Sequence, residues 1–394
     1  MLTLQTANQL LVFKYLIPLF NPEVNQWATP ARLLRWLTLL WLLIGLVVLL
    51  SASYPIADAN FGDGLYYFKR QVIWAYLGLI LFNVATRVRL IYWLRMAPFA
   101  LILLLGLVFA TNFAGVTVNG AQRWLAIGPL LLQPSELIKP FLVLQSALVF
   151  GKWYRFSRGA RIFWLAIFAL VLGGILIQPN LSNTALCGMS LWLIALAGVI
   201  RWRHLGMVAA SGLGLATLSI MTQDYQLERV TSFLNPWAEA QGDSYQLTQS
   251  LMAIGSGGTW GTGLGLSHQK LFYLPIQYTD FIFAVFAEEF GFVGCLGLLM
   301  LIISFAALAL MVANQARNAI HRLIATGAVI FLVGQTLINI GVATGSLPTT
   351  GLPLPLFSYG GNSVLASLFL AGLLVRVARE NKEGNVVEFP NSSR

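Results

Sequence analysis

WLTLLWLLIGLVVLLSA, residues 36–52, is a continuous apolar stretch without a charged side chain. A helix of this length nearly crosses the hydrocarbon core of a bilayer, which is about 30 Å thick. Comparable stretches follow at 72–86, 97–113, 135–151, 162–178, 185–200, 205–221, 281–312, 323–345 and 362–376. The sequence therefore predicts an all-α polytopic membrane protein with about ten transmembrane helices.

The composition supports this class. Of 394 residues, 58% are hydrophobic and only 10% are charged, so polar side chains are too few to cover a soluble domain of this size. The net charge of +10 does not indicate a nucleic-acid partner, because the basic residues recur in short clusters between apolar stretches. Their spacing indicates membrane topology instead.

The basic clusters also predict the orientation. With the N-terminus inside, most of the 24 Lys and Arg residues fall in inner segments, as the positive-inside rule requires. Both termini are then cytoplasmic, and most acidic residues lie on the outer side. Excess acids outside are explained either by solvation of loops or by chemistry that faces outward.

This topology divides the chain into three parts. Residues 1–34 form a cytoplasmic or interfacial N-terminal segment, 35–376 the transmembrane domain, and 377–394 a cytoplasmic tail. Between the seventh and eighth helices lies a large extracytoplasmic loop, 222–280, which is too long for a simple connector. A second unusual segment, 346–361, is apolar but rich in Pro and Gly, so we expect protein to cover it or a cavity to border it.

Asp280 lies where the long outer loop becomes the eighth helix. Its spacing alone favours a plain helix N-cap. The alternative is a general base or a metal-binding acid, since the residue lies on the outer side together with several cations.

Other candidate residues lie in the fourth and eighth helices and in the outer loop before the fourth. Glu136 and Lys139 suit the first turn of the fourth helix, where ordinary capping and an ion pair between them are the simple explanation. Arg123 and Lys139 together offer an alternative, a site for an anionic head group. Glu288 and Glu289 are adjacent within the eighth helix, so at least one points into the bundle, either paired structurally or active in catalysis.

Two other kinds of site find no support in the sequence. The glycine-rich segments 254–258 and 260–265 lack the Lys-Ser/Thr of a phosphate-binding P-loop, so tight turns explain them better. Two of the three histidines, His204 and His321, fall on the inner side, which makes a Ser-His-Asp triad improbable.

Taken together, the motifs resemble one family, the SEDS proteins of bacterial shape, elongation, division and sporulation, which include FtsW and RodA. The segments that carry the resemblance are NGAQRW (119–124), QPSELIK (133–139), YQLTQSLMAIGSGG (245–258), QKL (269–271), YTDFIFA (278–284), EEFG (288–291), GSLPTTGLPLP (345–355) and SYGGNS (358–363). Together and in this order they are highly specific.

The resemblance implies a peptidoglycan glycosyltransferase of the bacterial plasma membrane. Such an enzyme polymerises lipid II at the outer face and works with a class B penicillin-binding protein, within the divisome or the elongasome. Asp280 matches the family's catalytic aspartate, which deprotonates the acceptor hydroxyl so that it displaces undecaprenyl pyrophosphate with inversion. The resemblance matches Arg123 and Lys139 to the family's basic positions. The full set of candidate substrate-binding residues is Arg123, Gln133, Glu136, Lys139, Lys270, Glu288, Glu289, Ser358 and Tyr359. A divalent cation, Mg²⁺ or Mn²⁺, is expected near the pyrophosphate, with Asp280 as its candidate ligand.

The chain departs from the family pattern in two segments. Residues 178–184 read QPNLSNT where many relatives have an aspartate, so no acid acts there. Residues 275–280 read PIQYTD, without the Glu and His that many relatives place before the aspartate. The second departure puts more weight on Asp280, because no neighbouring Glu or His can assist it.

Two other classes of protein remain as alternatives, a lipid II flippase and a scaffold for a partner synthase. A flippase is disfavoured because the sequence shows no internal repeat, and a scaffold does not explain the outward acid and cations. Within the family, QKL followed by YLP (273–275) resembles the division branch, FtsW, more than the elongation branch, RodA.

Overall fold

A computed structural model of the chain describes residues 22–118, 121–128, 130–178, 180–198, 200–238, 241–242 and 244–386. Asn119 and Gly120 of the first family motif, and the last residues of the predicted tail, lie outside this set. Helices lie at all ten of the predicted spans. They are α2 (Thr29–Phe61), α3 (Tyr66–Arg87), α4 (Leu90–Ala114), α5 (Pro134–Gly151), α6 (Arg158–Ile177), α7 (Leu181–Ala197), α8 (Trp202–Thr222), α11 (Ile282–Gln315), α12–η3–α13 (Ala319–Val329, Ile330–Gly334, Gln335–Ala343) and α14 (Gly361–Val386).

Within the described residues, seven of these helices are long and apolar enough to cross a membrane: α2, α4, α6, α8, α11, α12–α13 and α14. The shorter α7 is also apolar. The polytopic helical class is therefore confirmed, whereas the count of ten spans stays a prediction. Here α14 continues as a helix to Val386, into the segment predicted as the tail.

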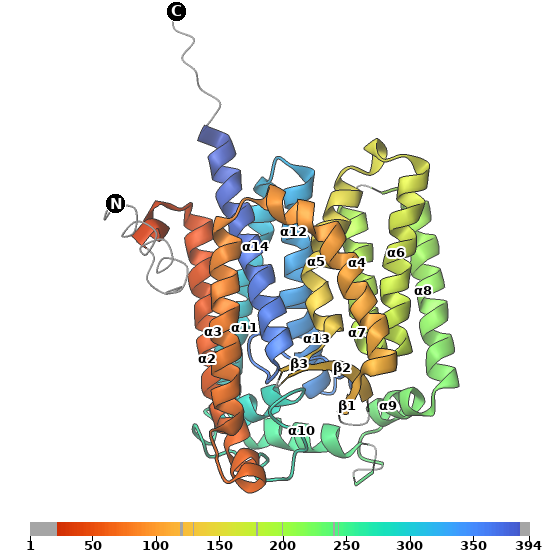
Figure 1. Ribbon diagram of the computed structural model, residues 1–394. Coiled ribbons are helices and arrows are strands. Elements are labelled where there is room, and N and C mark those ends of the chain that lie inside the picture. The colour runs from red at the N-terminus through yellow and green to blue at the C-terminus, as the bar shows by residue number, and fades with distance from the viewer. Residues whose placement is uncertain are drawn as a thin grey trace, which may run out of the picture.

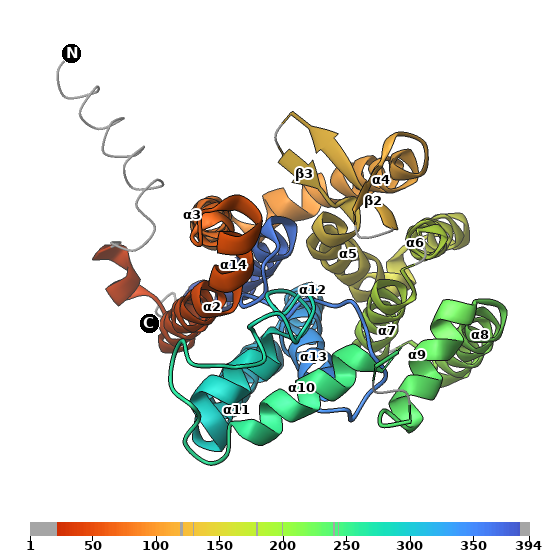
Figure 2. The ribbon, with the colours of Figure 1, turned by 90° about the horizontal axis from the view of Figure 1, so that it is seen from below.

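The helices stand side by side in one bundle (Figure 1). Both ends of the described chain lie at the same end of the bundle, as the predicted topology requires, and the long loops gather at the opposite end, called here the outer end. Seen from that end (Figure 2), α12, α13 and α14 are surrounded by other helices, while α8 lies at the edge and packs mainly against α7 and α9. Most of the spanning part of α14 is accordingly buried.

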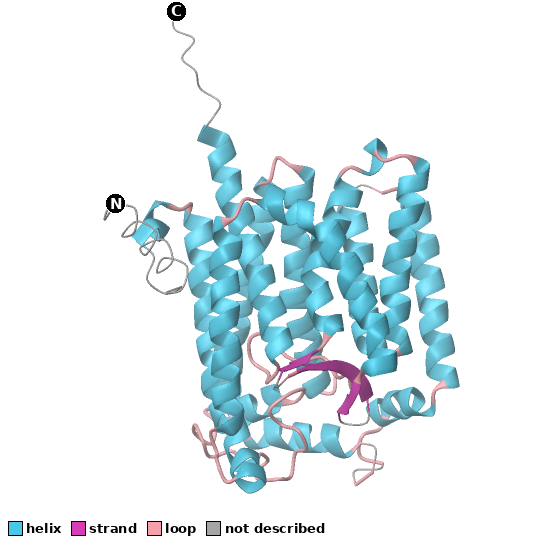
Figure 3. Cartoon of the chain, viewed as in Figure 1, coloured by secondary structure: helices cyan, strands magenta, loops and turns pink. Residues whose placement is uncertain are grey.

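The outer end contains structure that the sequence did not predict. Strands β1 (Val116–Val118), β2 (Ala121–Ile127) and β3 (Leu130–Leu132) form a small antiparallel sheet in the order β1-β2-β3 (Figure 3). The all-α class holds for the chain as a whole, but the sequence did not predict these strands, because strands of three to seven residues leave little periodic signal. Two further helices, α9 (Asp224–Leu234) and α10 (Tyr245–Ser256), occupy the long outer loop, and short helical turns η1 (Pro22–Gln26) and η2 (Trp153–Arg155) lie at the inner end.

A break at Gly291 interrupts α11, which the sequence predicted as one continuous span. Gly291 has φ +63° and ψ −165°, a conformation essentially restricted to glycine. The segment after α10 runs beside this break: Thr262 N donates to Glu288 O at 2.9 Å, and Phe292 N donates to Gly258 O at 2.9 Å. The glycine-rich segments are therefore sites of close backbone approach, as expected of tight turns.

Replacing Gly291 with Ala is expected to destabilise the protein. A Cβ at this position would lie 2.3 Å from the Gly261 nitrogen, in addition to the strain of the backbone conformation. The expected loss in unfolding free energy is at least about 2 kcal/mol, seen as a lower midpoint in a thermal melt. Gly255→Ala is the matched control, because Gly255 is helical and nothing lies within 4 Å of the place that a Cβ would take there; an equal loss in both variants would contradict the assignment.

The segment rich in Pro and Gly, residues 346–361 and called here the Pro-rich loop, is covered by protein, which confirms the sequence prediction. Leu352, Leu354, Leu356 and Phe357 are all buried. The segment passes so close to α2 that a Cβ on Gly45 would lie 2.2 Å from the Leu356 carbonyl oxygen. This loop is therefore a fixed part of the outer half of the bundle.

Candidate active site around Asp280

Asp280 lies just before α11 but does not cap it. The N-cap position is Phe281, and no side chain makes a capping hydrogen bond there. No residue that the structure describes donates a hydrogen bond to the Asp280 carboxylate. The N-cap explanation, favoured by spacing alone, is therefore wrong, and the carboxylate is left for another role.

The backbone around Asp280 is held at three successive carbonyl groups. The Tyr278 carbonyl accepts from Tyr359 N at 2.9 Å, and the Thr279 carbonyl accepts from Ser358 Oγ at 2.5 Å. The Asp280 carbonyl accepts from Asn339 Nδ2 at 2.7 Å. Because every link is made to the Pro-rich loop or to α13, the acid is fixed relative to the bundle.

Burial raises the pKa of the Asp280 carboxyl to about 6, while Arg229 and Arg123 act to lower it and Glu136 acts to raise it. The residue as a whole is half-buried, so protein encloses it without sealing it from solvent. A carboxylate with such a pKa is ionised at neutral pH and is a stronger base than an ordinary aspartate. The arrangement suits proton abstraction.

Two arginines approach this carboxylate from different elements. Arg123 extends from β2, and its Nε donates to the Gln178 carbonyl at 2.9 Å. Arg229 extends from α9, and its Nη1 donates to the Thr349 carbonyl at 3.3 Å. The position that a Cβ on Gly351 would take lies 3.7 Å from Asp280 Oδ2, so the acid and Arg229 both lie against the same stretch of the Pro-rich loop.

Glu136 and Lys139 form a buried ion pair at the start of α5. Their charged atoms lie 2.6 Å apart, and both side chains are almost fully buried. Lys139 Nζ also donates to Gln335 Oε1 at 3.2 Å. The ion pair expected from their spacing is confirmed, and binding of substrate by either residue stays a prediction. Gln133 is the N-cap residue of α5 but makes no side-chain capping bond.

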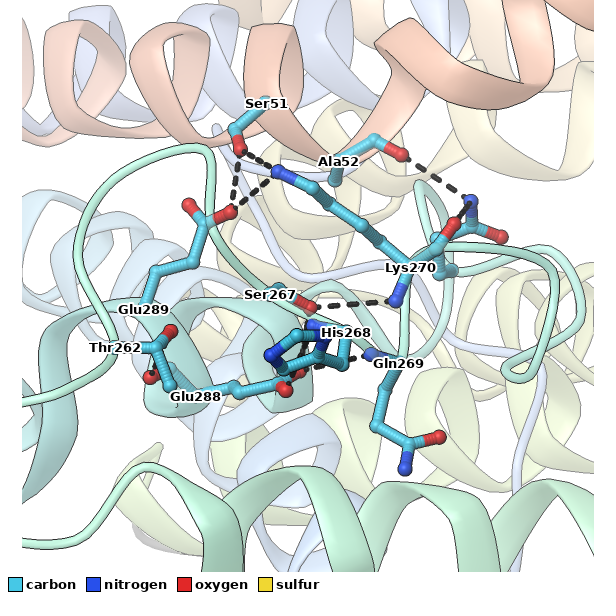
Figure 4. Close-up of polar contacts among 10 residues, drawn as sticks. Ser51, Ala52, Thr262, Ser267, His268, Gln269, Lys270, Glu288 and Glu289 are labelled. Carbon is cyan, nitrogen blue, oxygen red and sulfur yellow. Dashed lines mark hydrogen bonds and ion pairs between the residues drawn. The ribbon is translucent and has the colours of Figure 1, made fainter.

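Lys270, Glu288 and Glu289 form a second cluster (Figure 4). Lys270 Nζ lies 2.7 Å from Glu289 Oε1, and both groups contact Ser51 of α2. Glu288 accepts hydrogen bonds from Ser267 Oγ and from the backbone of His268 and Gln269. These contacts join the loop before Asp280 to α2 and α11, so the geometry favours the structural explanation that the sequence left open, and substrate binding here gains no support.

Ser358 and Tyr359 also act on the backbone. Besides its bond to Thr279, Ser358 Oγ accepts from Leu354 N at 2.8 Å, which closes a turn of the Pro-rich loop. Tyr359 packs against Tyr67 and Tyr278, with ring centroids 5.1 and 5.7 Å away. Both residues lie next to the acid, as predicted, through contacts that hold its segment.

The structure thus brings Asp280, Arg123, Glu136, Ser358 and Tyr359 to one region of the outer end. Lys270, Glu288 and Glu289 make their contacts in the separate cluster. Sequence reasoning missed Arg229, Gln335 and Asn339. One signal in the sequence could have pointed to Gln335 and Asn339: they are polar side chains within an apolar span, and such side chains need partners.

A metal site made of protein alone is not present among the described residues, because no three His, Cys, Asp or Glu side chains converge there. Of the two carboxylates in this region, Asp280 is the one available to a metal ion, since Glu136 is paired with Lys139. Mg²⁺ is often held by one or two carboxylates together with substrate phosphates and water. The residues present fit that mode of binding.

The departure at residues 178–184 has a local explanation. Asn180 Oδ1 accepts from Asn183 N at 3.3 Å and so caps α7. Asn and Asp are equally good N-caps, so loss of the acid leaves this function intact.

Comparison with known proteins identifies the family. The family model FtsW/RodA/SpoVE, described as "Cell cycle protein", matches residues 31–383. The chain belongs to this family. It is 56% identical over 383 residues to "Probable peptidoglycan glycosyltransferase FtsW" from Synechocystis sp., covering 97% of each chain. It is 50% identical over 374 residues to a "Putative peptidoglycan glycosyltransferase FtsW" from Mesostigma viride, covering 95% of this chain and 90% of that one.

Solved structures of the FtsW/RodA/SpoVE family share the fold. Thermus thermophilus RodA superposes with a TM-score of 0.65 at 29% identity, covering 88% of this chain and 96% of that one. A chain from the structure titled "Structural coordination of polymerization and crosslinking by a peptidoglycan synthase complex" gives 0.71 at 29% identity, covering 88% and 97%. The family resemblance and its membrane class are confirmed, so the chain is a multi-pass plasma-membrane protein.

Proposed function

We propose that this chain is a peptidoglycan glycosyltransferase of the FtsW type, which polymerises lipid II for the septal wall during cell division. One observation carries the proposal: Asp280, a half-buried residue at the outer end, has a raised carboxyl pKa and two arginines near it, and it does not cap its helix. The relatives in the comparison support the activity and the division branch, since they are named FtsW glycosyltransferases.

The reaction needs a base at the acceptor. Asp280 takes the proton of a hydroxyl on the acceptor sugar, and that oxygen attacks the anomeric carbon of the donor. The bond between this carbon and undecaprenyl pyrophosphate breaks, with inversion at the carbon. The pyrophosphate leaves with the bonding electron pair, and the proton stays on Asp280 until solvent removes it.

Charge develops on the departing pyrophosphate as the bond breaks. Guanidinium groups stabilise such charge well, because their planar forks match phosphate oxygens. Arg123 and Arg229 are the cations electrostatically coupled to Asp280, from β2 and α9. We assign them to the pyrophosphate, in place of the more deeply buried Lys139.

A divalent cation is part of the proposal. Mg²⁺ or Mn²⁺ would be held by Asp280 together with pyrophosphate oxygens and water, and would neutralise charge on the leaving group. A class B penicillin-binding protein is the proposed partner within the divisome. Support comes from the complex whose title joins polymerization to crosslinking, one chain of which shares this fold.

The rate of polymerisation should depend on pH through Asp280. The base must be ionised, and burial raises its pKa to about 6. We expect kcat/KM to be level above this pH and to fall tenfold per unit below it. A rate that stays level down to pH 4.5 would show that no base with this pKa limits the reaction.

A product assay tests the function. Purified chain, with a class B partner whose transpeptidase is inactivated, should convert lipid II into long glycan strands on a gel. Unchanged lipid II under conditions where the chain is folded would contradict the proposal. The alternatives, a flippase or a polymerase of the elongation branch, predict leaflet movement without polymer, or co-purification with an elongation-specific partner.

A further inference from the structure

Two amide side chains follow the π-helical turn η3, where the helical phase changes. Gln335 and Asn339 lie one turn apart on α13 and are both nearly fully buried. A π-helical turn carries an extra residue and is frequent at functional sites. Both side-chain amides donate hydrogen bonds to backbone carbonyls of the outer loops.

Asn339 joins two loops that are far apart in sequence. Its Nδ2 donates to the Asp280 carbonyl at 2.7 Å and to the Leu352 carbonyl at 2.9 Å. A side-chain amide has two N–H donors on one nitrogen, so both are used here. Other small polar side chains, such as Ser, Thr or Asp, cannot donate two bonds from one atom in this way.

Gln335 extends the same chain of contacts. Its Nε2 donates to the Pro353 carbonyl at 2.7 Å, and its Oε1 accepts from Lys139 Nζ at 3.2 Å. Lys139 is in turn paired with Glu136 on α5. Adjacent carbonyls of the Pro-rich loop, at Leu352 and Pro353, are thus held by adjacent turns of α13.

We propose that Asn339, supported by Gln335, is the positioning residue that fixes the position and orientation of the Asp280 carboxylate relative to the bound sugars. This rests on the proposed role of Asp280 as the base. The bonds from Tyr359 N and Ser358 Oγ to the carbonyls of Tyr278 and Thr279 join the segment before Asp280 to the Pro-rich loop. Asn339 bonds the carbonyl of Asp280 itself to a helix of the bundle, so without it the acid loses this direct link to α13.

Asn339→Leu removes both donors at similar volume and should lower kcat about 10–100-fold, because small displacements of a reacting group have large effects on rate. KM should change little. The acid limb of the pH profile should also move by at least about half a unit, since the surroundings of Asp280 set its pKa. Uniform damage to the fold would not shift that limb.

Thr336→Val is the matched control, because Thr336 is buried on the same helix and its hydroxyl donates to the Leu332 carbonyl one turn back within that helix. It should retain both kcat and the acid limb. If Asn339→Leu does not fold, Gln335→Met, which also removes a bond to the Pro-rich loop, carries the test with the same readouts and a smaller loss.

Three variants separate the possible failures. If Asp280→Asn still polymerises lipid II, the base assignment fails and the positioning role fails with it. If Asp280→Asn is inactive while folded Asn339→Leu matches the wild type in kcat and acid limb, only the positioning role is wrong. A loss of kcat in Thr336→Val equal to that in Asn339→Leu would also overturn it.

Discussion

Asp280→Asn is expected to abolish polymerisation and at the same time to make the protein more stable at neutral pH. Loss of a general base costs roughly 10²–10⁴-fold in rate. Burial raises the pKa of this carboxyl to about 6, so the folded protein favours the protonated form. Stability is therefore lost as pH rises from the unfolded value, near 4, through about 6. The neutral amide avoids this cost, roughly 1–3 kcal/mol at about 1.4 kcal/mol per pKa unit.

Activity on lipid II and thermal melts at pH 4 and pH 7.5 measure both effects. The gain in melting temperature should appear at pH 7.5 and vanish at pH 4. Asp63→Asn is the control, because Asp63 is an outer carboxylate paired with Lys69 at the surface, and the change should leave both quantities near wild type. An inactive Asp280→Asn that is also less stable at pH 7.5 would point to a structural role instead.

Breaking the buried pair at α5 should have the largest effect on stability. Lys139→Met leaves Glu136 buried without its 2.6 Å partner, which typically costs about 3–5 kcal/mol. Lys139→Met combined with Glu136→Gln removes both charges and should recover most of the loss. Melting temperatures of the two variants and the wild type, measured in the same detergent, make the comparison.

A double variant as unstable as Lys139→Met would mean that the charges are not held as a pair. If Lys139→Met is as stable as the wild type but inactive, Lys139 binds the pyrophosphate instead. A stability measurement on these variants therefore separates a structural role of the Glu136–Lys139 pair from a role in substrate binding.

The helical bundle was predictable because crossing a bilayer demands long apolar stretches, and the positions of α2 to α8, α11, α12–η3–α13 and α14 follow from them. The strands β1 to β3 and the break at Gly291 were not predictable in the same way. A short strand carries too few residues for a periodic pattern, and the break depends on a loop from α10 approaching α11. Local sequence does not encode such an approach.

The site was predictable only in part. Asp280 was found from its place at the start of a helix and its family motif, although spacing pointed to a capping role that the structure excludes. Arg229 and Asn339 reach the acid from elements 51 residues before it and 59 residues after it, and only the fold brings them together. The pairing of Lys270 with Glu289 likewise needed the loop to fold back onto α2.

The most direct test of the account places the purified chain and a transpeptidase-inactive class B partner in sealed liposomes, with lipid II accessible outside. Glycan strands and the distribution of lipid II between leaflets are measured together for the wild type and Asp280→Asn. The account predicts strands from the wild type, none from Asp280→Asn, and no movement of lipid II between leaflets that depends on Asp280. Movement of lipid II without strands from the wild-type protein would contradict it.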